Sequence, residues 1–144
     1  MAARTANALW EGSVQEGRGR MSLGSGAFEG NYSFQSRFGE GENGTNPEEL
    51  LAAAHAGCFT MALSLALGDG GNVPESIQTQ AKVSMRNIDG LPTITKVALS
   101  TRARVPGIDD DAFQKAAVAA KEGCIVSRAL TGVDEVTLDA ALEG

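Results

Sequence analysis

The chain contains two cysteines, and their surroundings point to thiol chemistry. Cys58 lies in an apolar stretch that runs from Leu50 to Leu67, and Cys124 follows a glycine much later in the chain. A lone buried thiol is usually only a small hydrophobic side chain. As argued below, we expect the protein in the cytoplasm, which is a reducing compartment where a permanent disulfide is not expected. Two cysteines there are either idle or redox-active. Both are therefore candidate catalytic residues.

Cys58 would need a nearby positive charge to react as a thiolate. It lies well inside a predicted helix, so the helix start does not lower its pKa and burial raises it. His55 falls on a neighbouring helix face, where a lone histidine is more often a hydrogen-bonded packing residue than a catalytic partner. Arginine is the better candidate because it stays charged when buried and can bind a carboxylate through two hydrogen bonds. Arg37, at the end of an aromatic segment, is well placed in the sequence for this role.

Glu49 tests whether one chain can hold the whole site. From Glu49 to Cys58 an ideal helix turns by about 900° and rises by about 13.5 Å. The two side chains then point to opposite sides of the helix and cannot share a site within one chain. If both are catalytic, Glu49 must reach the Cys58 of a second copy, and small residues around Gly57 would allow two helices to approach closely. A structural role for Glu49, in a capping box with Asn46, is equally open and can hold at the same time.

Cys124 is predicted to precede a short helix, whose start favours negative charge. That position suits either a thiolate or a resolving thiol, although an ordinary buried cysteine remains the alternative. The sequence has one histidine, and the cysteines lack the spacing of zinc ligands. No glycine-rich loop joins a strand to a helix in the pattern of a phosphate site. We therefore expect neither a metal nor a cofactor.

The composition is that of one globular domain covering residues 1–144, with 42% hydrophobic and 21% charged residues. A net charge of −6 argues against a nucleic-acid partner, which would require a basic surface. The first residues lack the apolar run of a signal peptide, so we expect a cytoplasmic protein. The stretch from Leu50 to Leu67 approaches the length of a membrane span. Because it begins at two glutamates and contains His55, we predict a core helix and no membrane partner.

The hydrophobic pattern predicts an α+β fold. Strands and turns are expected over the first 40 residues, including a strand through Tyr32 to Phe38. Asn46 and Pro47 are typical of a helix start and predict a long helix to about Leu67. The remaining expected elements are a hairpin over 77–85 and 97–105, a helix over 110–122 and a closing strand over 136–142.

Several of these segments together resemble the OsmC/Ohr family of thiol peroxidases, and the OsmC (osmotically inducible protein) branch in particular. The resemblance covers essentially the whole chain. It is carried by Leu9-Trp10-Glu11-Gly12, Gly17-Arg18-Gly19, Arg37-Phe38, Thr45 to Leu50, Ala54 to Ser64, Val105-Pro106-Gly107-Ile108 and Gly123-Cys124.

The resemblance implies a two-cysteine peroxidase in which an antiparallel sheet wraps around a long buried central helix. It also implies an intertwined homodimer with its active sites at the interface. In matching positions, Cys58 is the peroxidatic cysteine and Cys124 the resolving one. Arg37 would hold the thiolate, and Glu49 would orient Arg37. The implied activity is reduction of organic hydroperoxides, and more weakly of hydrogen peroxide, in oxidative and osmotic stress defence.

The implied cycle ends in a Cys58–Cys124 disulfide that a dithiol, for example a lipoyl group, would reopen. An apolar pocket that includes Phe34, Phe59 and Met61 would favour organic substrates. One departure concerns Ile125, which stands where the family usually has proline, and it should loosen the turn after Cys124 and restore an N–H there.

Two other functions stay open. The first is a non-catalytic protein that binds an apolar small molecule in the interface pocket. The second is a hydrolase that uses Cys58 and His55. Both cysteines together with Arg37 and Glu49 favour the peroxidase, because a binding protein needs no thiol and His55 has no obvious acid to orient it.

Overall fold

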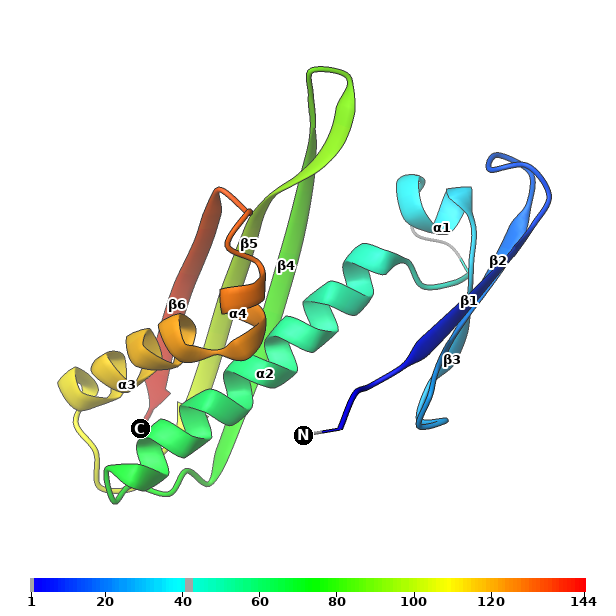
Figure 1. Ribbon diagram of the computed structural model, residues 1–144. Helices are drawn as coiled ribbons and strands as arrows, with labels where there is room; N and C mark the ends of the chain where they lie inside the picture. The colour runs from blue at the N-terminus through cyan, green and yellow to red at the C-terminus, as the bar shows by residue number, and fades with distance from the viewer. Residues whose placement is uncertain (1, 41–42) are drawn as a thin grey trace. The chain divides into compact units, whose positions relative to one another are not determined.

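The chain folds into two compact units, Met1–Leu50 and Leu51–Gly144 (Figure 1). The structure, a computed structural model, describes residues 2–40 and 43–144. The first unit contains β1 (Ala6–Glu11), β2 (Arg18–Leu23), β3 (Glu29–Tyr32), α1 (Phe34–Phe38) and the first turn of α2 (Pro47–Asp69). The second contains the rest of α2, β4 (Ser76–Ile88), β5 (Leu91–Arg104), α3 (Asp110–Gly123), α4 (Ile125–Ala129) and β6 (Glu135–Glu143).

The first unit is built on an antiparallel sheet in the order β1-β2-β3. Trp10 of β1 and Tyr32 of β3 pack against each other across the central strand, with ring centroids 5.3 Å apart and planes tilted by 60°. Gly19 of β2 lies between them, and a Cβ added there would come within 2.5 Å of both rings. The glycine is therefore required for this aromatic pair.

The predicted strand through Phe38 is wrong, because Phe34–Phe38 forms the short helix α1. Ser33 and Ser36 form a reciprocal capping box at its start. The buried Ser36 hydroxyl also donates to the Thr45 carbonyl at 2.7 Å, and the Asn46 amide donates to the Ser36 carbonyl at 2.9 Å. These contacts tie α1 to the start of α2, and they override the alternating pattern of the local sequence.

The predicted long helix is confirmed as α2, and its cap is the expected one. The Asn46 side chain accepts from the backbone N–H of Glu49 at 2.7 Å. In the second unit the residues at every fourth position are buried, namely His55, Phe59, Leu63 and Leu67. The opposite face is apolar but exposed, with Met61 at 77% and Leu65 at 66%. The helix is long and apolar enough to cross a membrane by length and composition, yet one of its faces belongs to a protein core.

The second unit contains a three-stranded sheet in the order β4-β5-β6. The predicted hairpin is confirmed, and Asp89 and Gly90 both have positive φ at its turn. β6 pairs with β5 in parallel, so the expectation of a wholly antiparallel sheet is wrong for this pair. The reason is the connection through α3 and α4, which returns the chain to the starting end of β5.

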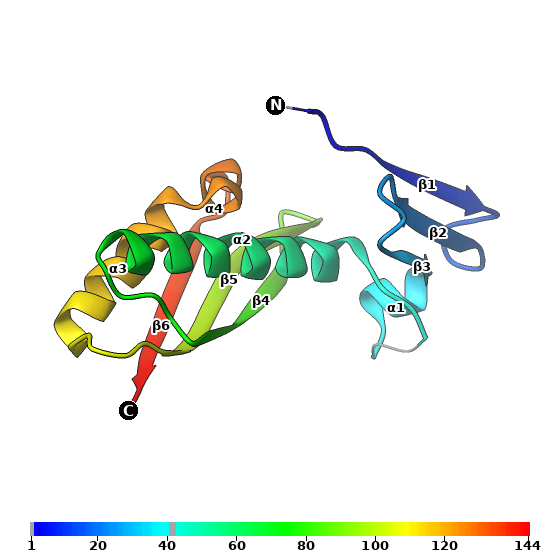
Figure 2. The ribbon, with the colours of Figure 1, turned by 90° about the horizontal axis from the view of Figure 1, so that it is seen from below.

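α2 and α3 cover one face of this sheet (Figures 1 and 2). Their buried residues join the inward positions of β5 in a single core. Phe59 of α2 and Phe113 of α3 are fully buried there, together with Leu99 of β5. Asp109 caps α3 by accepting from the backbone N–H of Ala112 at 2.8 Å. The α+β class predicted from the sequence is confirmed.

Candidate active site

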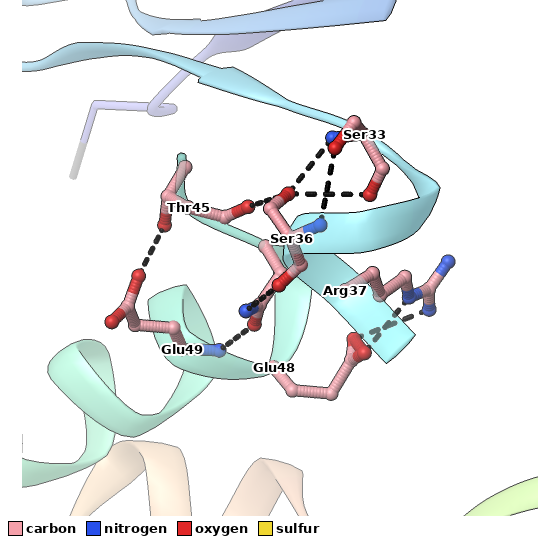
Figure 3. A network of polar contacts seen from close by, with 7 residues as sticks. Ser33, Ser36, Arg37, Thr45, Glu48 and Glu49 are labelled. Atoms are coloured by element: carbon pink, nitrogen blue, oxygen red, sulfur yellow. Dashed lines mark hydrogen bonds and ion pairs between the residues drawn. The ribbon is translucent and has the colours of Figure 1, made fainter. Parts of the chain in front are cut away.

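In the first unit, α1 presents Arg37 to the first turn of α2 (Figure 3). The Arg37 Nε donates to Glu48 Oε1 at 2.8 Å, and Nη2 donates to Oε2 at 3.2 Å. This two-point geometry fixes the plane of the guanidinium as well as its position. The Glu48 side chain is only 10% exposed, whereas that of Arg37 is 40% exposed. The arginine is thus anchored on one side and open on the other.

Glu49, which we expected to orient Arg37, has a different partner in this structure. Its carboxylate accepts from the Thr45 hydroxyl at 2.7 Å, on the other side of the helix turn from Arg37 (Figure 3). The physical reason is the step of about 100° between neighbouring helical residues, which turns only one of the two acids toward α1. Glu48 is therefore the residue that orients Arg37 within the chain, and the sequence reasoning missed it.

A cavity of about 200 Å³ lies beside Arg37 in the same unit. Its walls are mainly aromatic and include Trp10, Tyr32, Phe34 and Phe38. The Arg37 guanidinium also lies over the Phe38 ring, 5.2 Å from the centroid. The predicted role of Phe34 in an apolar pocket fits this cavity. Two other expected pocket residues lie in the second unit, where Phe59 is fully buried in the core and Met61 is exposed.

In the second unit, α2 and the turn before α4 bring the two cysteines together. Both are free, and their side chains share a hydrogen bond. Cys124 is almost fully buried, at 1% exposure, whereas Cys58 is partly exposed. Two sulfur atoms in hydrogen-bond contact are close enough for one to attack the other once it is oxidised.

The two thiols differ in acidity. Burial raises the pKa of Cys58, and its hydrogen bond to Cys124 raises it further, against the N–H groups of Val126 and Ile125. Burial also acts to raise the pKa of Cys124, but hydrogen bonds from Cys58, Ser127 and Val126 outweigh it and the net pKa is lowered. Within the second unit, the thiolate of the pair is therefore better stabilised on Cys124.

His55 does not form the pair with Cys58 that a hydrolase would need. Its Nε2 lies 2.6 Å from the Ser127 hydroxyl, and burial lowers its pKa, so the ring is neutral at pH 7. Nδ1 has no hydrogen-bond partner among residues 2–40 and 43–144. A histidine without an acid on Nδ1 lacks the orienting group of a catalytic triad.

The structure thus gathers the predicted site residues in two places. Cys58 and Cys124 lie together in the second unit, whereas Arg37 lies in the first unit with Glu48, and Glu49 of that unit contacts Thr45 instead. Sequence reasoning missed Glu48 and Ser127. The signal for Glu48 was present, because two acids follow Pro47 in the first helical turn and either could have been the partner of Arg37.

An α+β fold with two free cysteines in contact defines a thiol-based redox protein. The family model for OsmC-like proteins matches residues 39–139. The Escherichia coli (strain K12) peroxiredoxin OsmC is 50% identical over 137 residues, which is 94% of each chain. The organic hydroperoxide resistance protein of Xanthomonas axonopodis pv. citri is 34% identical over 72% of this chain and 71% of that one.

The solved structures agree on the fold. The crystal structure of the organic hydroperoxide resistance protein OhrB of Bacillus subtilis superimposes with a TM-score of 0.69 at 24% identity. It covers 96% of this chain and 98% of that chain. The present chain belongs to the OsmC family.

Proposed function

We propose that this protein is a thiol-dependent peroxidase that reduces organic hydroperoxides, and hydrogen peroxide more weakly, with Cys58 as the peroxidatic residue. The observation that carries the proposal is the contact between two free cysteines of unequal exposure in a member of this family. The more exposed thiol meets the peroxide, and the buried one resolves the product. The names of the relatives, peroxiredoxin and organic hydroperoxide resistance protein, support the same reaction.

In the first step the Cys58 thiolate attacks the terminal oxygen of the hydroperoxide. The O–O bond breaks, the alkoxide leaves and takes up a proton to become an alcohol, and Cys58 becomes a sulfenic acid. In this proposal the Arg37 of a second copy stabilises both the thiolate and the departing alkoxide, because a fixed cation favours the negative charge that develops on them. Glu48 holds the guanidinium plane for this task.

In the second step Cys124 attacks the sulfenic sulfur of Cys58. An S–S bond forms, the S–O bond breaks, and water is released. A dithiol then reduces the disulfide by thiol exchange. A lipoyl-type dithiol suits this step because its two sulfurs close into a ring and leave both cysteines reduced.

The pKa of Cys58 is raised by burial and by Cys124, so its thiolate needs a positive charge that the thiol pair does not supply. This need supports a cation from elsewhere as a partner of Cys58. Cys58 lies ten positions after Glu48 in α2, and an ideal helix rises by about 15 Å over that length. This separation supports a homodimer in which the Arg37 of one copy serves the Cys58 of the other. The active sites are then shared between two chains.

The exposed face of α2 supports the same assembly. Met61 and Leu65 leave large apolar side chains in water, which a second copy would cover. Gly57 lies on this face, and a Cβ added there would meet nothing within 4 Å. Glycine in the middle of a helix costs about 1 kcal/mol relative to alanine. Nothing in the described chain requires that cost, whereas a close helix–helix contact between copies would.

The aromatic cavity beside Arg37 supports the preference for organic hydroperoxides. An alkyl or aryl group fits among the aromatic walls while the peroxide oxygens reach the guanidinium. Hydrogen peroxide would gain the charge contact but not the apolar one. We further propose that the chain works as a single functional domain. We place it in the cytoplasm, where dithiol reductants are available.

Two alternatives are less well supported. Binding of an apolar molecule by a non-catalytic protein would use the aromatic cavity, but it would not need two thiols in contact. A hydrolase based on His55 would need a partner for Nδ1, and the described residues do not provide one.

The deciding experiment counts free thiols after one equivalent of an alkyl hydroperoxide. The reduced protein should lose both thiols per chain, and the Cys58→Ser variant should lose none. Replacing Ser100, which is exposed on the outer face of β5, gives a matched control that should behave as the wild type. Survival of both thiols in the wild-type protein would disprove the peroxidase proposal.

A further inference from the structure

His55 and Ser127 form a part-buried polar contact that the steps above do not use. His55 comes from the core face of α2 and is fully buried, and Ser127 comes from α4. The 2.6 Å distance between Nε2 and the hydroxyl oxygen is that of a strong hydrogen bond. Burying a histidine is costly unless its ring nitrogens are hydrogen-bonded, and the Ser127 hydroxyl satisfies Nε2.

The ring tautomer follows from the partners of its two nitrogens. If Nδ1 carried the hydrogen, a buried N–H would have no acceptor among the described residues. Hydrogen on Nε2 leaves only a lone pair unused, which is the less costly arrangement. Nε2–H therefore donates to the Ser127 oxygen, and the Ser127 hydroxyl hydrogen is free to point elsewhere.

The other neighbour of Ser127 is Cys124. The Ser127 hydroxyl and backbone N–H both act on the Cys124 sulfur and favour its thiolate. Cys124 is too deeply buried for water to do the same. A chain of donors thus runs from the His55 ring through the Ser127 hydroxyl to the resolving sulfur.

We propose that His55 and Ser127 are positioning residues for the resolving step: His55 holds the Ser127 hydroxyl so that it donates to the Cys124 sulfur. The inference rests on the proposed peroxidase function. In the step that it serves, the Cys124 sulfur forms the S–S bond, and the S–O bond of the Cys58 sulfenic acid breaks. The thiol proton of Cys124 leaves with the hydroxide as water, so no further reactant is needed.

The test separates the two steps in a single turnover with an alkyl hydroperoxide. Ser127→Ala should slow the disulfide-forming step by about tenfold, the value of a hydrogen bond to a charged group, and leave the peroxide-consuming step unchanged. The sulfenic acid should then accumulate and become trappable by dimedone. Ser127→Thr, which keeps the hydroxyl, should restore the disulfide-forming rate, and His55→Gln should fall between the two.

A second measurement needs no turnover. In a Cys58→Ser background, ultraviolet thiolate absorbance reports the titration of Cys124. The pKa of Cys124 should be higher in Ser127→Ala than in Ser127→Thr. Equal disulfide-forming rates, or equal titrations, in the alanine and threonine variants would overturn the inference. Thermal melting identifies any variant that fails to fold. Failure of the peroxidase proposal itself would look different, because the wild-type protein would then keep both thiols.

Discussion

On our proposal, the two units of this chain hold complementary halves of one active site. The first unit contains an arginine fixed by a carboxylate and bordered by an aromatic cavity, and its described part contains no thiol. The second contains two thiols in contact, whose pKa values are set by burial, by each other and by neutral hydrogen-bond donors. In the second unit as it stands, the more exposed thiol is the weaker acid. The positive charge that would make Cys58 the stronger acid is that of Arg37, which belongs to the first unit.

On our proposal, this difference means that neither half is reactive by itself. A partly exposed cysteine with a raised pKa is mostly protonated at pH 7, and an arginine without a nucleophile only binds anions. On our proposal, assembly of two copies joins the halves. Activity then depends on the dimer as well as on the residues.

The largest effect is expected from removing the charge of the first unit. Arg37→Met should lower the rate of Cys58 oxidation by on the order of 100-fold, the usual cost of losing a donor at developing negative charge. The measurement is stopped-flow consumption of an alkyl hydroperoxide. A rate within a few-fold of wild type would show that the thiols of the second unit need no outside cation.

A mixing experiment tests whether the two halves come from different chains. Arg37→Met and Cys58→Ser proteins are each expected to be inactive, but after subunit exchange a mixed dimer has one complete site. An equal mixture should recover about a quarter of wild-type activity, because about half of the dimers are mixed and each has one working site of two. No recovery, with exchange verified by mass spectrometry, would place both halves within one chain.

The acid behind Arg37 gives a smaller and sharper effect. Glu48→Gln should slow peroxide consumption by about tenfold, because it removes the charged partner of a two-point contact. Glu49→Gln should change the rate by less than about twofold, since Glu49 accepts only from Thr45. The two variants control for each other. The reverse order would restore Glu49 as the residue that orients Arg37.

The smallest effect is expected at Ile125 in the second unit. Its backbone N–H acts on the Cys58 sulfur and lowers the pKa of that thiol, and proline would remove this donor. Cys124 has φ −59° and ψ 128°, a conformation that permits a following proline. Ile125→Pro should raise the pKa of Cys58 slightly and change the rate by no more than about twofold. A downward shift in the thiolate titration would contradict the assigned contact.

Much of this fold could be predicted from local sequence. Asn46 and Pro47 mark the start of α2, and Asp89-Gly90 marks the hairpin turn, because each depends on backbone chemistry within a few residues. The predicted thiol peroxidase agrees with the relatives of the chain. α1 was misjudged because a five-residue helix is too short to show its period, and Phe34, Ser36 and Phe38 imitate the alternation of a strand.

The remaining differences depend on contacts between distant segments. The parallel pairing of β6 depends on the path of the chain through α3 and α4, which no local pattern records. The choice between Glu48 and Glu49 depends on the rotation of α2 relative to α1. In an ideal helix, Glu49 would lie about 180° from Cys58 around the helix axis, whereas Glu48 lies only about 80° from it. The rise along the helix, rather than the opposite faces, now supports a second copy.

The aromatic pair across Gly19 also gives the protein an optical reporter. Trp10 is the only tryptophan in the sequence, and it forms part of the cavity wall beside Arg37. Its fluorescence is therefore sensitive to occupancy of that cavity and depends on no sulfur atom. In a variant without either cysteine, a change in its emission on adding a peroxide analogue would measure binding alone, so affinity and turnover can be followed as two independent signals.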